Sequence, residues 1–310
     1  MPLTETKSRT RICNPFMGAL TIIGLSTLPY FHDFITYSEG LRSWVPVLGI
    51  EKILTDSNNK ILGFSAYRVF LYTFFIFVFA AIGWAGWYRT ARHKYYGNGL
   101  LLVLFSGLYQ VVLIVLNLRR TMFNELEPKL IFLALLFLAL GYFSYKKHGL
   151  SSQKVVVWST LAILAILPYL HDVLTSRDGE IWSWVPNLGI ESFLTDSQGM
   201  VRGFRSYRLL LYLFGIYLFS HLGWIGWFMD AKGKKYRAFL LVPAALSLYQ
   251  VILIMMSRRE TEFNSPSINL YITIGLSILL AINFYYNNNV SPKNEKVTKS
   301  KNIKTSESEN

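Results

Sequence analysis

The stretch IGWAGW, residues 82–87, returns as LGWIGW at residues 222–227, 140 positions later. Other stretches recur at the same spacing. SWVPVLGIEKILTD from Ser43 matches SWVPNLGIESFLTD from Ser183, and LYQVVLI from Leu108 matches LYQVILI from Leu248. Recurrence of whole segments at one fixed spacing is typical of an internal repeat. The sequence therefore predicts one structural unit that is used twice.

The composition indicates a membrane protein. The chain has 310 residues, of which 52% are hydrophobic and 16% are charged, and its mean hydropathy is +0.33. This leaves too little polar surface to cover a soluble globule. Crossing a bilayer takes roughly 20 apolar residues in a helix. Eight such runs lie near residues 15–35, 68–88, 99–118, 129–145, 155–175, 208–229, 238–257 and 268–286. We expect an all-α integral membrane protein with eight transmembrane helices.

The repeat fixes how the two halves are related. Four spans separate equivalent helices, and because four is even, both halves enter the membrane in the same direction. We therefore expect two parallel four-helix repeats about a pseudo-twofold axis along the membrane normal. The predicted organisation is an N-terminal segment (1–14), the first repeat (15–145), a linker (146–154), the second repeat (155–288) and a disordered basic tail (289–310).

The distribution of charge predicts the orientation. With the N-terminus inside, the inner segments hold 18 of the 31 Lys and Arg residues but only 5 of the 18 Asp and Glu residues. An excess of Lys and Arg marks the cytoplasmic side. We expect a multi-pass protein of a cell inner membrane with both termini in the cytoplasm. The positive charge is then explained by topology and anionic lipid, and the sequence predicts no nucleic-acid partner.

Each repeat has one long outer loop, of roughly 35 residues, between its first and second spans. The apolar residues that follow Pro46 and Pro186 favour a short helix, because proline suits the first position of a helix. We expect this helix to lie at the interface and cap the bundle.

A histidine and an aspartate end the first span of each repeat. PYFHDFIT, residues 29–36, holds His32 and Asp33, and PYLHDVLT, residues 168–175, holds His171 and Asp172. The proline of each motif is expected to kink its span. One interpretation is structural, with Asp33 paired to Arg68 and Asp172 paired to Arg208, because an unpaired carboxylate at this depth is costly. The other makes the four motif residues catalytic, with the imidazole as a general base.

Further polar residues shared by both repeats fall at the same outer level. They are Tyr67, Arg68, Arg119 and Asn124 in the first repeat, and Tyr207, Arg208, Arg259 and Asn264 in the second. If the spans of one repeat pack as neighbours, each repeat gathers one imidazole, one carboxylate and two guanidinium groups. We expect the arginines and tyrosines of this set to bind substrate.

Other residues have both a structural and a functional interpretation. Gln110 and Gln250 lie inside spans, where a buried amide either ties helices together or lines a polar cavity. His221 has no counterpart, because Ala81 stands at the equivalent position, and it is either satisfied locally or functional. The glycines of the IGWAGW and LGWIGW stretches permit close helix contact, and the tryptophans suit an aromatic belt at the inner interface.

Three functions remain open. A transporter or channel-like protein would bind its solute between the halves, without proton coupling because no ionisable residue lies mid-span. A noncatalytic subunit of a membrane complex would use its outer loops to dock a membrane-protein partner. An outer-leaflet enzyme would act on an anionic or lipid-linked substrate through His, Asp and Arg. No HExxH, P-loop, GxSxG or Rossmann motif occurs, so we expect no common catalytic family, no metal site and no cofactor.

Overall fold

The computed structural model describes residues 15–37, 40–45, 64, 66–149, 151–176, 178–186, 195, 201, 204, 206–256 and 262–289. Helices dominate these residues, and the strands among them are the two-residue pair β1 (Thr36–Tyr37) and β2 (Gly40–Leu41). The predicted N-terminal segment, the interfacial helices predicted after Pro46 and Pro186, and the tail from residue 290 lie outside the described residues.

The helices follow the apolar runs of the sequence. In chain order they are α1 (Pro15–Ser26), η1 (Leu28–Tyr30), α2 (Phe31–Ile35), α4 (Tyr67–Ala91), α5 (Gly97–Val115), η2 (Met122–Asn124), α6 (Leu126–His148), α7 (Ser152–Ile166), η3 (Leu167–Tyr169), α8 (Leu170–Leu174), α10 (Tyr207–Asp230), η4 (Arg237–Leu240), α11 (Leu241–Met255), η5 (Glu262–Asn264) and α12 (Pro266–Asn289). The η elements are short 3₁₀ helices. Each of them adjoins an α-helix or lies at a connection.

Seven helical segments among the described residues are long and apolar enough to cross a membrane. They are Tyr67–Ala91, Gly97–Val115, Leu126–His148, Ser152–Leu174, Tyr207–Asp230, Arg237–Met255 and Pro266–Tyr286. The chain is thus a multi-pass membrane protein. The first of the eight predicted runs, residues 15–35, forms no single helix of that length. There α1 has 12 residues, and a turn at Thr27 separates it from η1 and α2.

Proline tightens both runs, and the break at Thr27 is confined to the first. Pro29 and Pro168 lie in η1 and η3, where the helix tightens from the α to the 3₁₀ form. Proline has no N–H to donate and its ring crowds the preceding turn, so it changes the course of a helix. In the first run Ser26 and Thr27 also donate their hydroxyls to the carbonyls of Ile22 and Gly24, both at 2.8 Å. Such back-bonding bends helices further.

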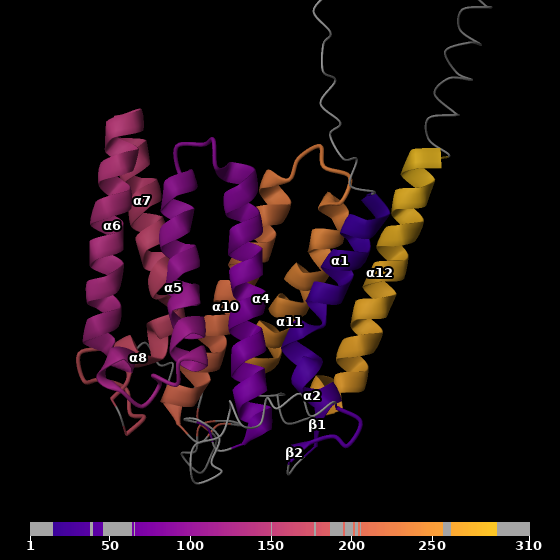
Figure 1. The fold of residues 1–310 in the computed structure, drawn as a ribbon, viewed down its shortest axis with the longest axis horizontal. Coiled ribbons are helices and arrows are strands. Elements are labelled where there is room, and N and C mark those ends of the chain that lie inside the picture. Colours follow the sequence, from indigo (N-terminus) through magenta and orange to yellow (C-terminus); the bar gives the residue numbers. More distant parts are fainter. Residues whose placement is uncertain are drawn as a thin grey trace, which may run out of the picture.

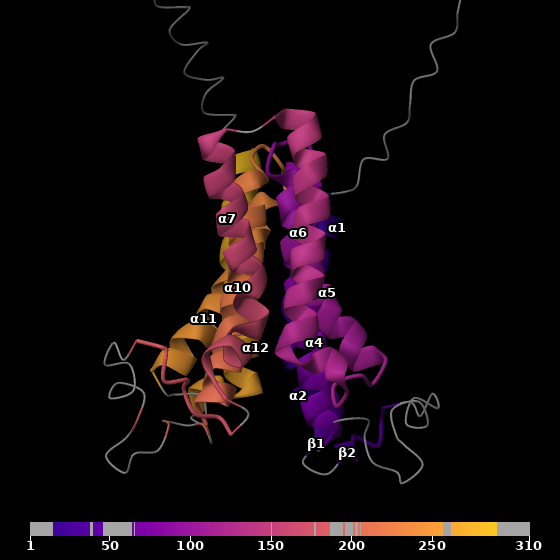
Figure 2. The ribbon, with the colours of Figure 1, turned by 90° about the vertical axis from the view of Figure 1, so that its left-hand side faces the viewer.

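The helices form two layers. Figure 2 shows α1, α4, α5 and α6 in one layer and α7, α10, α11 and α12 in the other. Along the bundle in Figure 1, α6, α5, α4 and α1 follow one another in the first layer, and α7, α10, α11 and α12 do so in the second. The start of α1 and the end of α12 lie at one end of the bundle, and β1 and β2 lie at the other. The two layers diverge toward this second end (Figure 2), which we call the loop end.

The layers meet most closely where α4 crosses α10. A Cβ on Gly86 would lie 2.1 Å from Cε3 of Trp227, and a Cβ on Gly226 would lie 2.2 Å from Cε3 of Trp87. The other two glycines, Gly83 and Gly223, have equally reciprocal contacts with Trp224 and Trp84. Each helix thus offers glycine where the other offers tryptophan, and the backbones approach closely.

The prediction of an aromatic belt is wrong for two of the four tryptophans, Trp84 and Trp224. Trp84 and Trp224 are fully buried between α4 and α10, and Trp84 donates its indole N–H to the carbonyl of Phe219 at 3.0 Å. Glycine on the facing helix leaves a hollow that a large ring fills. Rings buried there fill the space between the layers, whereas rings at the membrane–water interface would leave it empty.

Hydrogen bonds to one aspartate, which we call the polar clamp, join the layers where α4 and α10 end. Asp230, at the end of α10, accepts hydrogen bonds from Lys94 at 2.5 Å, Tyr96 at 2.7 Å and Trp87 at 3.0 Å. The hydrogen bond to Asp230 raises the pKa of Lys94 above its usual value. The carboxylate of the clamp is not repeated in the first half, where threonine occupies the equivalent position, Thr90.

Candidate functional site

A cavity of about 960 Å³ lies between the two layers, at the first turns of α4 and α10. Both halves line it. Its charged lining residues are three arginines and two aspartates, namely Arg68, Arg119, Arg208, Asp33 and Asp172. Among the described residues, the lining therefore carries one more positive than negative charge. Tyrosines, asparagines and a glutamine supply much of the remaining wall.

The His-Asp motif of each half is held by its own helix end. His32 accepts a hydrogen bond at its backbone carbonyl from Thr36, 2.6 Å away, and His171 accepts one from Thr175, 2.5 Å away. The backbone N–H of Thr36 and of Thr175 donates to the same carbonyls, so each of α2 and α8 ends on a carbonyl with two donors from one threonine. The short helices thereby aim both motifs at the cavity.

The Asp172 end of the cavity is crowded with cations. Asp172 accepts a hydrogen bond from Lys129 at Oδ2, at 2.6 Å, and forms an ion pair with Arg208 at Oδ1. The Lys129 side chain is only 2% exposed and the Asp172 side chain 6%. Such burial is tolerable because the charges are paired. Arg208 also donates to the carbonyl of Ser176, at 3.0 Å.

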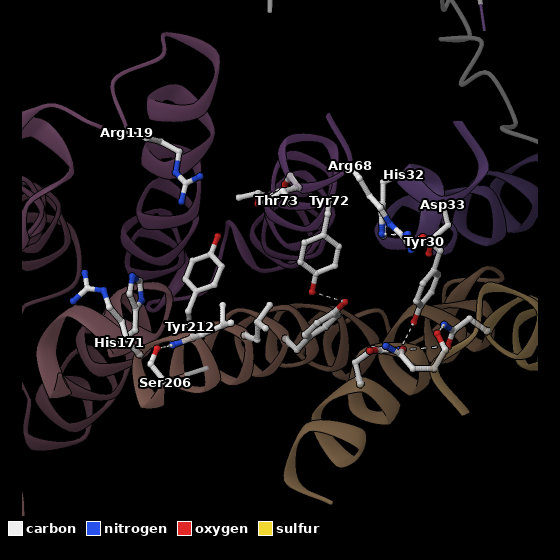
Figure 3. A pocket seen from close by; sticks show the side chains of 18 of the residues that line it. Tyr30, His32, Asp33, Arg68, Tyr72, Thr73, Arg119, His171, Ser206 and Tyr212 are labelled. Atoms are coloured by element: carbon white, nitrogen blue, oxygen red, sulfur yellow. Dashed lines mark hydrogen bonds and ion pairs between the residues drawn. The ribbon is translucent and has the colours of Figure 1, made fainter. Parts of the chain in front are cut away.

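Arg119 adds a third cation that no carboxylate balances. Its guanidinium carbon lies 4.2 Å from the centre of the Phe64 ring, and it has no ion pair among the described residues. It lines the cavity together with Asp172 and Arg208. In Figure 3 Arg119 lies on the side of the cavity that holds His171 and Tyr212. This end therefore has an excess of positive charge.

The end of α5 explains how Arg119 reaches this position. Asn117 has a left-handed backbone, with φ of 56°, and the N–H of Leu118 donates to the carbonyl of Leu113 at 2.8 Å. This is the pattern of a Schellman cap, in which asparagine or glycine ends a helix and reverses the chain. The reversal carries Arg119 back toward α10.

The prediction that each repeat gathers its own arginines is wrong for Arg119. This residue belongs to the first half but lies beside the His171–Asp172 motif of the second half. The reason lies in the packing of the spans. The helix α7 packs against α5, and η3 packs against α10, whereas α1 packs against α11. The third span of one half thus faces the first span of the other. Arg259, the equivalent of Arg119, lies outside the described residues.

The Asp33 end has the same ion pair but fewer cations among the residues that the structure describes. Asp33 accepts from Arg68 at Oδ1, and Nε2 of His32 lies 3.3 Å from the same oxygen. The other ring nitrogen of His32, Nδ1, lies 3.0 Å from the carbonyl of Pro29. Both nitrogens of this ring face acceptor oxygens, so the ring is held in place. Both predicted pairs, Asp33 with Arg68 and Asp172 with Arg208, are present.

An amide network replaces the lysine at this end. Gln250 donates to the hydroxyl of Tyr30 at 3.3 Å, to Oδ1 of Asn264 at 3.0 Å and to Oδ1 of Asn269 at 3.3 Å. These contacts tie α11 to η1, η5 and α12. The structural interpretation of Gln250, a tie between helices, is correct, and the residue also lines the cavity.

Tyrosines lie between the two ends. Tyr72 of α4 donates to the hydroxyl of Tyr217 of α10 at 3.1 Å, and the bond joins the layers across the cavity (Figure 3). The ring of Tyr72 stands edge-on to that of His32, and the ring of Tyr212 stands edge-on to that of His171. The same aromatic contact therefore recurs at each motif.

The cavity brings together most of the predicted site residues. His32, Asp33, Arg68, Arg119, His171, Asp172, Arg208 and Gln250 line it. Three others do not: Tyr67, Tyr207 and Gln110, the last of which is buried within α5. His221 does not line the cavity either, and its Nδ1 lies 2.9 Å from the carbonyl of Ala244, a contact that ties α10 to α11.

Sequence reasoning missed Lys129. It begins the fourth span and was counted with the charged residues at the outer ends of spans. A comparison of the repeats contains the signal, because Asn269 stands at the equivalent position in α12. A lysine in one copy and an asparagine in the other marks a site where the halves differ in charge.

Comparison with protein-family models, curated proteins and solved structures gives no match to this chain. Among the described residues, no group of three or more His, Cys, Asp and Glu side chains is placed to hold a metal ion. The function of the chain is therefore inferred from the cavity and its charges.

Proposed function

We propose that the chain is a membrane transporter with eight spans, built as two parallel four-helix repeats about a pseudo-twofold axis along the membrane normal. The solute binds in the cavity between the repeats. The observation that carries this proposal is the 960 Å³ polar cavity itself, which residues of both halves line. Cavities between repeated halves are where transporters of this build hold their solutes.

The bounds of the helices support a duplication. The helices α4 and α10 begin at Tyr67 and Tyr207, and α6 and α12 begin at Leu126 and Pro266, each pair 140 residues apart. The reciprocal glycine–tryptophan contacts are those expected of two helices related by a twofold axis.

The two His-Asp motifs, 29–36 and 168–175, are 139 residues apart, whereas the later recurring stretches are 140 apart, and a turn explains the difference. Thr36 pairs with Leu41 in the first half, whereas Thr175 pairs with Ile181 in the second, which leaves one more residue in the turn. Gly179 lies in this longer turn with φ of 92°, a conformation that favours glycine.

The first run supports an eighth span. Its counterpart, Ser152–Leu174, is a continuous segment of spanning length that consists of α7, η3 and α8. The first run has the same three elements in the same order, interrupted only by Thr27. In Figure 1 α1 and α2 continue along one side of the bundle from one end toward the other. We therefore assign residues 15–35 as a span.

The charges of the cavity favour a solute with an anionic group. Arg119 lines the cavity without a carboxylate partner among the described residues, and Arg208 and Lys129 lie at the same end. A guanidinium group binds carboxylate or phosphate through paired hydrogen bonds. Transport without proton coupling fits this site. A proton relay needs a carboxylate that exchanges its proton, whereas both aspartates of the cavity are held in ion pairs.

The distribution of Lys and Arg supports the rest of the assignment. We place both termini in the cytoplasm and the protein in a cell inner membrane. The loop end, with its cavity, then faces outward. The domain bounds are those given by the repeat, with linker 146–154 between the halves.

The other two functions have less support. The enzyme considered above would use an imidazole nitrogen directed at its substrate, whereas both nitrogens of His32 face acceptors of the chain itself, and Nδ1 of His171, which has no hydrogen-bond partner among the described residues, is buried. A subunit that only docks a membrane-protein partner has no need of a charged cavity between its halves.

Cysteine accessibility tests whether the cavity opens to both sides of the membrane. In a Cys13→Ser background, Thr73→Cys and Leu213→Cys place single thiols at equivalent, buried cavity positions of α4 and α10. A transporter exposes its binding site to each side in turn. We expect an impermeant thiol reagent to modify both positions from either side of oriented vesicles.

Ala81→Cys is the matched control, because Ala81 is buried in α4 outside the cavity lining. It should react from neither side. Reaction of the cavity thiols from the loop end only would overturn transport and favour a docking or binding protein.

A further inference from the structure

The two aspartates of the cavity have nearly identical partners at one oxygen. Oδ1 of Asp33 accepts from Arg68 and lies 3.3 Å from Nε2 of His32. Oδ1 of Asp172 accepts from Arg208 and lies 3.4 Å from Nε2 of His171. Each carboxylate thus repeats the other's contacts, atom for atom, at Oδ1.

The aspartates differ at the second oxygen. Oδ2 of Asp172 accepts a hydrogen bond from Nζ of Lys129 at 2.6 Å. Oδ2 of Asp33 has no hydrogen-bond or ion-pair partner among the described residues. An ionised carboxylate accepts several hydrogen bonds, so Asp33 keeps an unused acceptor within a charged cavity.

One substitution between the repeats causes this difference. Lys129 and Asn269 occupy equivalent positions in α6 and α12. Asn269 is buried and accepts from Gln250, so its shorter, neutral side chain belongs to the amide network. At the Asp33 end, no ammonium group of the described chain occupies the place that Lys129 fills at the other end.

We propose that Oδ2 of Asp33 binds a primary ammonium group of the solute, in the place that Nζ of Lys129 takes at Asp172. This inference rests on the proposed solute cavity and names the class of solute. Since the Arg119 end favours an anionic group, the solute is a zwitterion that carries both charges.

The Asp33 site has room and access for such a group. Asp33 lines the cavity, and its side chain is 12% exposed compared with 6% for Asp172. Arg68 is 52% exposed, so it keeps much of its hydration and holds Asp33 from the side of the solvent. The ion pairs of Asp172 demonstrate that one carboxylate of this fold binds a guanidinium at Oδ1 and an ammonium at Oδ2 together.

Butylammonium tests this site, because it is the lysine side chain as a free molecule. The full chain in detergent or nanodiscs is unfolded by heat in butylammonium chloride or tetramethylammonium chloride at equal ionic strength. A ligand that binds only the folded state raises the melting temperature. We expect a saturable rise with butylammonium and none with the quaternary ion, which has no N–H to donate.

Asp33→Asn tests the assignment to this carboxylate. It removes the charge but leaves Arg68 largely hydrated, and we expect half-saturation to need about tenfold more butylammonium or higher. Asp178→Asn, at an exposed carboxylate outside this cavity, is the matched control and should leave the response unchanged. An unchanged response in Asp33→Asn, or no response in the unmodified chain, overturns the proposal.

Lys129→Ala tests the same chemistry from the other half. It opens a space at Oδ2 of Asp172, and butylammonium should restore part of the lost melting temperature. The failure of this inference is distinct from the failure of transport. Thiol access from both sides without any butylammonium effect would leave transport standing and remove the ammonium site, and the reverse result would leave a binding site without transport.

Discussion

At the scale of single residues, Lys129 is the charge on which the local structure most depends. It is buried with Asp172 in an ion pair, and its loss leaves that carboxylate with Arg208, whose side chain is 32% exposed, as its remaining Lys or Arg partner among the described residues. We expect Lys129→Met to lower the free energy of unfolding by more than about 1 kcal/mol but by less than the roughly 3–5 kcal/mol that an uncompensated buried charge costs, because Arg208 still pairs with Asp172. Denaturant unfolding in micelles, followed by tryptophan fluorescence, measures this loss.

Lys94→Met is the matched control for Lys129→Met. Lys94 forms the same type of pair with Asp230, but its side chain is 47% exposed. The expected loss is at most about 1 kcal/mol, because water screens an exposed pair. Combining Lys129→Met with Asp172→Asn should recover part of the loss. If the double variant is no more stable than Lys129→Met alone, the buried charge is not the cause.

The sequence predicted residue pairs better than it predicted neighbours between halves. The pairs Asp33–Arg68 and Asp172–Arg208 follow from the cost of an unpaired carboxylate within the membrane, which is a local argument. The position of Arg119 depends on which half α7 packs against, and no periodicity of a single span contains that information. Lys129 was missed because its position near a span end seemed sufficient to explain its charge.

At the scale of elements, the crossing of α4 and α10 determines how the layers meet. The sequence indicated close contact at its glycines but assigned the tryptophans to an interface with lipid headgroups. Apolar aromatic residues near a span end fit either place, and only the facing helix decides between them. The reciprocal spacing of glycine and tryptophan in both repeats was the available signal.

Gly86→Ala and Gly226→Ala should each destabilise this crossing. The added methyl groups would lie 2.1 Å and 2.2 Å from ring atoms of Trp227 and Trp87, so either the ring or the helix must shift. Overpacking of a close contact typically costs about 1–3 kcal/mol. We expect similar losses for both variants in micelle unfolding, because the two contacts are reciprocal.

Gly141→Ala and Gly275→Ala are the controls for this crossing. An added Cβ at either position meets nothing within 4 Å. Alanine is the better helix former, by about 1 kcal/mol, so these variants should be neutral or more stable. Equal losses at all four glycines would mean that the contact with tryptophan is not what limits the crossing. In that case the double variant Gly86→Ala with Trp227→Leu would be no more stable than Gly86→Ala alone.

At the scale of the whole molecule, the number of spans decides the topology. Composition identified a multi-pass protein, and seven helices of spanning length were found among the described residues. The first run is the uncertain element of the count, because Pro29 and the turn at Thr27 divide it. Apolar length alone could not reveal this division, since a kinked span and a straight one have the same composition.

Reactive cysteines near the two termini distinguish eight spans from seven. An even number of spans places the termini on the same side of the membrane, and an odd number places them on opposite sides. We make Ser8→Cys and Ser300→Cys separately in a Cys13→Ser background and treat intact cells with an impermeant thiol reagent. Eight spans with cytoplasmic termini predict that neither cysteine reacts until the membrane is permeabilised. Trp184→Cys, next to the exposed turn at the loop end, should react in intact cells.

Reaction of Ser8→Cys but not of Ser300→Cys before permeabilisation would mean that residues 15–35 do not cross. The pseudo-twofold relation between the halves would then lose its first helix, and Asp33 would approach the cavity from a re-entrant segment.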